Sequence, residues 1–147
     1  MITVGRLAAS DRAAWERLFR EYIAFYQQDQ PQSMYDRAWA EFQSDSRMHA
    51  LGAWADGSLA GIVHFLVHAR TTAPDACYLE DLYTAAEYRG RGVARALINA
   101  VAEWAATRGC GRVYWHTHQD NTPARLLYDK VAAYRGFIMY TLELGQE

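Results

Sequence analysis

Residues 88–94 form a glycine-containing turn between two strongly patterned stretches, and this turn constrains the fold more than any other feature of the chain. It reads Tyr-Arg-Gly-Arg-Gly-Val-Ala, follows the strand-like run 76–84, and leads into an apolar helical stripe over 93–104. Gly109 ends that helix, and a second strand-like run, 112–117, follows almost at once. A connection of this length crosses over the sheet, so the strands that it joins run parallel. The sequence therefore predicts a mixed sheet with these two strands parallel.

The same turn has the chemistry of an anion-binding loop. Glycine lets the backbone approach a ligand closely, and successive N–H groups at a helix N-terminus converge on phosphate oxygens. Arg89 and Arg91 add two positive charges beside it. The glycine spacing matches neither the dinucleotide-binding fingerprint nor the P-loop. From this stretch alone, an anion-binding loop and an ordinary tight turn with two solvated arginines remain alternatives.

A second patterned segment begins at Asn121 and leads into a helix that carries Tyr128. We expect Thr122 to cap this helix, with Pro123 at its first position. The inward-facing positions recur at helical spacing: Ala124, Leu127, Tyr128 and Val131. Tyr128 therefore points inward, where it is either a packed core residue or a functional side chain.

Together the two segments resemble the cofactor motifs of the GNAT superfamily of acetyl-CoA-dependent N-acetyltransferases. The first motif is Arg89-x-x-Gly92-x-Ala94, and the second is the asparagine before the helix of Tyr128. The resemblance covers residues 78–137 well, and the earlier part of the chain in element order alone. It implies an α/β (α+β) fold in a single domain over residues 1–147, with a mixed six- or seven-stranded sheet, about four helices, and splayed fourth and fifth strands.

The resemblance also implies where acetyl-CoA binds. Its pyrophosphate would lie on the backbone N–H groups of the glycine turn, and its pantetheine arm would pair like an added strand with the end of strand 76–84. A backbone N–H there would polarise the thioester carbonyl, worth about 3 kcal/mol per preorganised donor. The implied cofactor-binding residues are Leu82, Tyr83, Thr84, Arg89, Gly90, Arg91, Gly92, Val93, Ala94, Arg95, Asn121 and Ala124. An asparagine favoured in a turn for local reasons explains Asn121 equally well.

The implied chemistry needs a proton donor and a base. Tyr128 is the expected donor to the departing thiolate, since a phenol with a pKa of about 10 is protonated at neutral pH. Glu80 is the expected base or amine anchor, and Asp81, Trp115 and His116 are further expected substrate-binding residues. Strand alternation places Glu80 and Asp81 on opposite faces unless a β-bulge re-aims the chain. Solvated or salt-bridged strand carboxylates are the alternative for both.

Periodicity predicts the remaining elements. Helices are expected over 10–26 and 33–43. Three strands, 49–54, 59–69 and 76–84, form a meander whose first turn is Asp56-Gly57. Two further strands are expected: residues 2–7 form the first element of the chain, and residues 137–144 form the last.

Composition bounds the class of protein. The chain has 147 residues, 51% of them hydrophobic, which suffices for one core. Its net charge of −2 is spread without long blocks of one sign, so no nucleic-acid partner is expected. No apolar run reaches the roughly 18 residues of a membrane span and the start does not resemble a signal peptide, which predicts a cytoplasmic protein with no membrane partner.

Two cysteines and five histidines are the residues that could bind a metal ion or form a disulfide. Cys77 and Cys110 each open an expected strand, and we expect both to be small core residues. The period-two pairs His64/His68 and His116/His118 are interpreted as polar strand-face residues, because no cysteine or carboxylate completes a metal-ligand set. No metal cofactor is expected.

The acceptor is the least constrained part of the prediction. The run 79–83 before Tyr88 resembles the diamine (spermidine/spermine) acetyltransferases, and Val113-Tyr114-Trp115 with Asn121 resembles a histone- and polyamine-acetylating group. Both imply a cationic small-molecule or peptide amine. Four carboxylates could supply an acidic wall: Asp29, Asp36, Glu41 and Asp45. A homodimer is expected through 137–144, since an unpaired edge of that composition would invite aggregation. The alternative function is a non-catalytic acyl-CoA-binding module or sensor.

Overall fold

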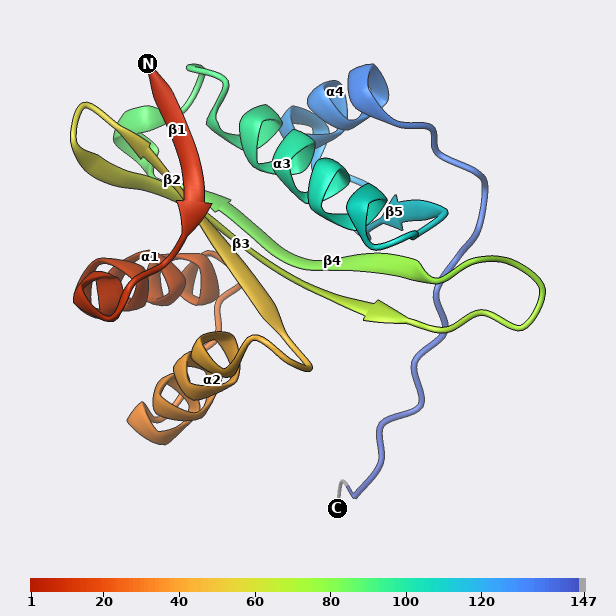
Figure 1. Ribbon diagram of the computed structural model, residues 1–147, viewed down its shortest axis with the longest axis horizontal. Coiled ribbons are helices and arrows are strands. Elements are labelled where there is room, and N and C mark those ends of the chain that lie inside the picture. Colours follow the sequence, from red (N-terminus) through yellow and green to blue (C-terminus); the bar gives the residue numbers. More distant parts are fainter. Residues whose placement is uncertain (146–147) are drawn as a thin grey trace. The chain divides into compact units, whose positions relative to one another are not determined.

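The structure is a computed structural model that describes residues 1–145. Within them it has five strands and four α-helices (Figure 1). In chain order they are β1 (Ile2–Arg6), α1 (Arg12–Phe25), α2 (Gln32–Ser44), β2 (His49–Ala55), β3 (Ser58–His68), β4 (Ala76–Thr84), α3 (Val93–Thr107), β5 (Arg112–Tyr114) and α4 (Thr122–Val131). Contacts divide the chain into two compact units, Met1–His116 and the part from Thr117 on.

The first unit is a sheet covered on both faces. The strand order is β1-β2-β3-β4-β5, with antiparallel pairing up to β4 and parallel pairing between β4 and β5. In Figure 1, α1 and α2 lie on one face of the sheet and α3 lies on the other. Leu59 to Phe65 of β3 are accordingly buried without alternation, as expected for a strand covered on both sides. The predicted parallel pair is confirmed.

The pairing of β4 with β5 is short. It joins Ala76–Tyr78 to Arg112–Tyr114 and stops there. From Leu79 to Thr84, β4 has β3 on one side, and among the described residues no strand pairs on the other. The two strands therefore part after three residue pairs, as the expected splay of the fourth and fifth strands requires.

Local sequence explains the turns that hold these elements. Asp56 and Gly57 both have positive φ, 53° and 80°, which is the conformation of the tight turn predicted between β2 and β3. Gly109, at φ 78°, ends α3 as predicted, with its own N–H and that of Cys110 bonded to carbonyls of the last helical turn. Gly61 lets α3 approach β3, since a Cβ there would lie 2.7 Å from the side chain of Val93.

The core of the first unit is strongly aromatic. Trp15, Leu18 and Phe19 form the buried stripe of α1, and Tyr35 and Phe42 form that of α2. Cys77 is fully buried, as expected for a small core residue, whereas Cys110 is half-buried in the loop before β5. The prediction was therefore wrong for Cys110, because the turn that ends α3 holds it outside the strand.

The second unit differs from the sequence prediction at its end. Residues 132–145 contain neither helix nor strand, and Phe137, Ile138, Met139, Tyr140, Leu142 and Leu144 are exposed. The prediction of a strand over 137–144 was therefore wrong, and the described sheet has five strands rather than six or seven. The reason is physical: a strand is defined by its partner, and this segment has none among the described residues.

Candidate active site

A β-bulge in β4 shapes the candidate site. Phe65 of β3 pairs with Leu79 and His64 pairs with Asp81, so Glu80 is an extra residue in β4. A bulge of this kind interrupts the alternation of side chains and bends the strand. Glu80 and Asp81, which alternation would place on opposite faces, consequently line the same pocket. The sequence analysis allowed for a β-bulge that would bring Glu80 and Asp81 together, and the structure has such a bulge at Glu80.

The pocket has a volume of about 410 Å³ and lies within the first unit. Its wall is aromatic and apolar on the side of α1 and α2, polar at the segment between them, and acidic at β4. The lining residues are Phe19, Tyr22, Ile23, Tyr26, Gln28, Gln30, Met34, Glu80 and Asp81. None of these described residues is cationic. The pocket is therefore suited to a positively charged group with an apolar extension.

Glu80 is held as a weaker acid than an ordinary glutamate. Burial is the largest cause of its raised pKa, and the neighbouring charge of Asp81 adds to it. His64 and His116 act in the opposite direction. Its side chain still reaches solvent, which a group that exchanges protons requires. A carboxylate with a raised pKa is a better proton acceptor near neutral pH.

Asp81 is held by a buried histidine. Its Oδ2 lies 2.9 Å from Nδ1 of His64, and Nε2 of the same ring lies 2.9 Å from Nε1 of Trp15. His64 and Trp15 are fully buried, whereas Asp81 is partly exposed to the pocket. The chain Trp15–His64–Asp81 thus connects the aromatic core to the pocket wall.

Tyr22 is the second side chain on Asp81. Burial is the largest cause of its strongly raised pKa, followed by the charge of Asp81. The Tyr22 hydroxyl therefore keeps its proton. Asp81 is a carboxylate at the pocket wall that is hydrogen-bonded to His64.

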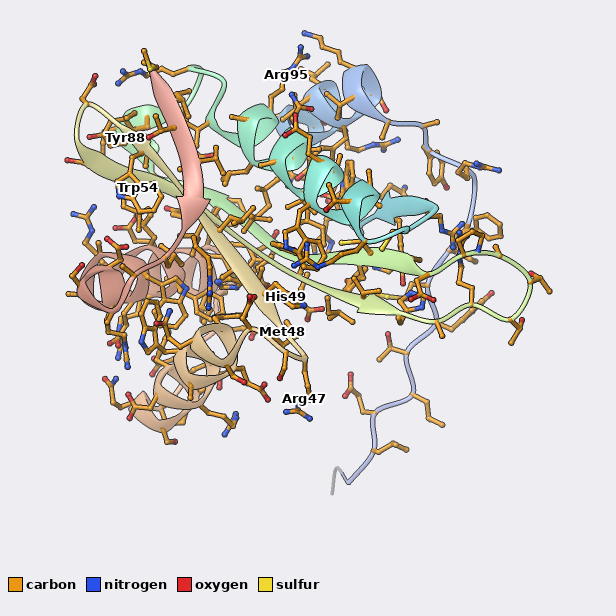
Figure 2. The ribbon with its side chains drawn as sticks, in the orientation of Figure 1. Arg47, Met48, His49, Trp54, Tyr88 and Arg95 are labelled. Carbon is orange, nitrogen blue, oxygen red and sulfur yellow. The ribbon has the colours of Figure 1, made fainter. Side chains whose placement is uncertain are left out.

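The glycine turn has the geometry of an anion cradle. Gly90 and Gly92 have φ values of 77° and 86°, and Gly92 is the N-cap of α3. The N–H groups of the first turn of a helix have no intrahelical acceptor. A Cβ built on Gly92 would meet no heavy atom within 4 Å, so the space above the turn is open. Arg95 projects from the start of α3 away from the sheet (Figure 2).

The two arginines before the helix, Arg89 and Arg91, already bond to other groups of the protein. Arg89 donates to the carbonyl of Thr84 at 3.2 Å and to the hydroxyl of Tyr83 at 3.4 Å. Arg91 pairs with Asp56 of the β2–β3 turn at 2.9 Å and lies over the ring of Tyr88. Both side chains brace the turn, and the backbone N–H groups are the donors left for an anion.

Leu82, Tyr83 and Thr84 form the end of β4 beyond its pairing with β5, so among the described residues no strand pairs with them on that side. The hydroxyl of Tyr83 donates to Glu21 of α1 at 3.0 Å, and its ring contacts Tyr22 of the same helix. The open edge and the glycine turn are joined by only a few residues of chain.

Trp115 and His116 follow β5 instead of lying in it. The predicted strand over 112–117 ends at Tyr114, so the expected alternation does not apply to them. Nδ1 of His116 lies 3.1 Å from the hydroxyl of Tyr78 in β4. Trp115 is half-buried. Neither lines the pocket of Glu80 and Asp81.

In the second unit, Asn121 takes the role predicted for Thr122. It is the N-cap of α4, with its Oδ1 accepting from the N–H of Ala124 at 3.5 Å, and Pro123 follows Thr122 in the first turn. The shift is understandable, since the cap residue needs a non-helical backbone and asparagine ranks above threonine there. Tyr128 is half-buried, and α4 has no fully buried residue, so the inward orientation expected for Tyr128 stays a prediction.

Sequence reasoning missed the aromatic wall and the buried partners of Asp81. His64 was interpreted as a polar strand-face residue, but it is fully buried. The signal that could have found it is its place in the middle of a continuous apolar strand, where a polar side chain needs a partner.

The expected acidic wall does not line the pocket. Asp36 pairs with Arg12, Glu41 with Arg47, and Asp45 with His49 and Arg6. Three of its four carboxylates are thus neutralised by cations of the protein. Asp29, the fourth, is not among the lining residues.

The described residues contain neither a cluster of metal ligands nor a membrane-spanning helix. In residues 1–145 no cluster of three or more His, Cys, Asp or Glu is arranged to hold a metal ion. No described helix is long and apolar enough to cross a membrane.

Comparison with known proteins identifies the family. A profile of the Acetyltransferase (GNAT) family matches residues 15–134. The D-amino-acid N-acetyltransferase HPA3 of Saccharomyces cerevisiae is 33% identical over 144 residues, which cover 95% of this chain and 89% of HPA3. This chain therefore belongs to the GNAT family of acetyltransferases. It is an N-acetyltransferase, an enzyme of class EC 2.3.1.

Solved structures agree in fold. The aminoglycoside N-acetyltransferase AAC(6′)-Iy in complex with CoA superposes with a TM-score of 0.86 at 18% identity, covering 98% of this chain and 95% of that one. The ribosomal-protein-alanine N-acetyltransferase of Brucella melitensis superposes with a TM-score of 0.80 at 25% identity, covering 98% and 100%.

Proposed function

We propose that this enzyme transfers the acetyl group of acetyl-CoA directly to a primary amine of a cationic acceptor, of the polyamine or lysine side-chain type. The observation that carries the proposal is the pocket in which the β4 bulge brings Glu80 and Asp81 together. Two carboxylates attract an ammonium group, and the aromatic and apolar wall accommodates the methylene chain behind it.

The charge of the pocket favours an acceptor without a carboxylate beside its amine. A free amino acid would bring its own carboxylate close to Glu80 and Asp81, and the described lining offers no cation to balance it. Like charges that close together repel, which lowers affinity. A D-amino acid is nevertheless the second candidate, because the relative HPA3 is named for that activity.

Acetyl-CoA as donor is supported by two features of this chain and by a relative. The glycine turn offers first-turn N–H groups of α3 to the pyrophosphate, and the open edge of β4 offers backbone groups of Leu82, Tyr83 and Thr84 to the pantetheine. The superposed AAC(6′)-Iy structure contains CoA. Residues Arg89 to Arg95, with Asn121 and Ala124, complete the proposed cofactor set.

In the proposed reaction the amine first loses a proton to Glu80, whose raised pKa suits it to accept one. The amine nitrogen then forms a bond to the acetyl carbon. As the carbon–sulfur bond breaks, Tyr128 gives its proton to the departing thiolate, and the nitrogen loses its second proton to the Tyr128 phenolate through solvent. Glu80 releases its own proton to solvent. Asp81 holds the acceptor, with Trp115 and His116 proposed at its outer part.

Transfer without a covalent enzyme intermediate fits the state of Cys77. Burial is the largest cause of the rise in the pKa of its thiol to about 12, so the thiolate needed for nucleophilic attack is scarce at neutral pH.

The proposed enzyme is a cytoplasmic homodimer joined through residues 137–144. An acyl-CoA sensor with no turnover is the alternative, and the named N-acetyltransferase relatives favour the enzyme.

The test is release of free thiol from acetyl-CoA with spermidine, a histone-tail peptide, D-amino acids and an aminoglycoside, with calorimetry of CoA binding alongside. Turnover on spermidine or the peptide supports the proposal. Turnover on D-amino acids alone would replace it with the second candidate, and tight CoA binding without turnover on any amine would favour the sensor.

A further inference from the structure

The hydrogen bonds of His64 fix where its proton lies. The indole Nε1 of Trp15 carries a hydrogen and can only donate, so Nε2 of His64, 2.9 Å away, must accept. The ring proton of a neutral His64 is then on Nδ1, which donates to Oδ2 of Asp81 at 2.9 Å. The hydrogen bonds therefore run in one direction, from core to pocket: Trp15 donates to His64, and His64 donates to Asp81. We call this the directed chain.

The surroundings of His64 hold the ring in place. Its ring is stacked on Phe42 at 4.1 Å between centroids and meets the edge of Phe19 at 4.7 Å. Every atom of the side chain is inaccessible to solvent, as is Trp15. Rotating the ring by half a turn would point carbon atoms at both partners and leave two buried polar groups unpaired. The orientation of the Nδ1–H is therefore set by the core.

The pairing of β3 with β4 places the Nδ1–H donor of His64 beside the bulge at Glu80. His64 is the β3 residue opposite Asp81, at the point where Glu80 is inserted. A bulged strand is a place where a side chain can be re-aimed. The bond from His64 specifies which way Asp81 points.

We infer that His64, locked by Trp15, is a positioning residue for acetyl transfer that holds Asp81 as the oriented anchor of the acceptor amine, an inference that rests on the proposed function. His64 bonds to Oδ2 of Asp81, and the ammonium of the acceptor binds the part of this carboxylate that is exposed to the pocket, beside Tyr22. A cation bound there has its nitrogen fixed beside Glu80. His64 itself touches neither substrate.

A pair of isosteric variants separates this role from mere packing. The amide N–H of an asparagine overlies Nδ1 of histidine, so His64→Asn keeps a donor toward Asp81 and loses the acceptor for Trp15. The amide of a glutamine overlies Nε2, so His64→Gln keeps the partner of Trp15 and loses the donor toward Asp81. Each variant loses one buried hydrogen bond, and their melting temperatures serve as the stability control.

We expect the acceptor KM of His64→Gln to exceed that of His64→Asn by about tenfold, the effect of one hydrogen bond to a charged group. The KM for acetyl-CoA is expected to be the same in both. Equal acceptor KM values in the two variants would overturn the positioning role while leaving the proposed function intact. A wild-type enzyme that acetylates no amine would instead overturn the proposed function.

Nitrogen NMR of the wild-type enzyme tests the same chain without a variant. With labelled histidine, His64 is expected to show a protonated Nδ1 and an unprotonated, hydrogen-bond-accepting Nε2. A protonated Nε2 at neutral pH, in either the other tautomer or the imidazolium, would contradict the directed chain. This readout does not depend on acetylation of any amine.

Discussion

Glu80 and Asp81 are adjacent in the chain, yet their surroundings give them different chemistry. Glu80 has a raised pKa through burial and through the charge of Asp81, whereas Asp81 accepts a hydrogen bond from His64. Two neighbouring carboxylates with unlike environments commonly divide the roles of proton exchange and charge binding. The proposed division, Glu80 as base and Asp81 as anchor, follows this pattern.

The pH dependence of the reaction tests that division. A base must be deprotonated to act, so a raised pKa moves the acidic limb of kcat/KM for the acceptor to higher pH. Asp81→Asn removes the second-largest cause of the rise. We expect its residual activity to have an acidic limb displaced to lower pH, measured as kcat/KM against pH for both proteins. A limb that stays in place or moves to higher pH would show that Glu80 is not the group titrating.

Tyr128 has a prediction of its own. Tyr128→Phe keeps the ring and removes the hydroxyl, so kcat is expected to fall by about a hundredfold, a typical loss for one proton-transfer group. Acetyl-CoA affinity, measured by calorimetry, should change little. Tyr134→Phe, at an exposed position outside residues 137–144, is the control. Equal losses in kcat and in affinity would mean that the ring packs and donates nothing.

At this scale the sequence singled out the two carboxylates as candidates but not how they are arranged, and the role of Tyr128 stays a prediction. Alternation separates Glu80 from Asp81, and only the bulge opposite His64 brings them to one pocket. A bulge depends on pairing between distant strands, which no local pattern records. The bond between Trp15 and His64 could not be predicted either, because 49 positions separate the two residues in the chain.

At the scale of elements, the glycine turn before α3 is the feature with the sharpest test. Gly92 and Gly109 stand at opposite ends of α3 with φ values of 86° and 78°. A side chain at either position adds about 1–2 kcal/mol of left-handed strain. Only Gly92 lies in the proposed cradle.

We expect Gly92→Val to abolish CoA binding and Gly109→Val to leave it near the wild-type value, with similar losses in melting temperature for both. Calorimetric titration with CoA and thermal unfolding measure the two effects. Wild-type CoA affinity in Gly92→Val would remove the turn from the cofactor site. Loss of binding in both variants would mean that strain in α3, and not the cradle, is responsible.

Helices and strands were predicted correctly where the apolar periodicity is long. The predictions failed where a segment becomes a strand only by pairing with another segment. The stripes of α1 and α3 and the bounds of β4 follow from apolar spacing and turn residues. The run 112–117 looks like one strand, but pairing with β4 ends at Tyr114. Residues 137–144 have strand-like composition and lack a partner among the described residues. Pairing is a property of two segments, so one segment cannot reveal it.

For the molecule as a whole, the exposed apolar residues 137–144 carry the prediction about assembly. Ile138 and Leu142 are 71% and 85% exposed, and an apolar stretch of this kind commonly marks an interface. Ile138→Glu with Leu142→Glu is expected to convert the proposed homodimer to monomer in sedimentation velocity. Leu126→Glu, at an exposed position on α4, is the control. A wild-type monomer at every concentration would contradict the dimer.

The measurement that tests the central claim most directly compares two acceptors that differ in one group. 1,5-Diaminopentane and lysine have the same carbon chain and two amines, but lysine adds a carboxylate beside one of them. Because Glu80 and Asp81 line a pocket without a described cation, kcat/KM for the diamine should exceed that for either enantiomer of lysine by about tenfold or more, and Glu80→Gln with Asp81→Asn should remove the preference. An enzyme that acetylates D-lysine well and the diamine poorly would contradict the account.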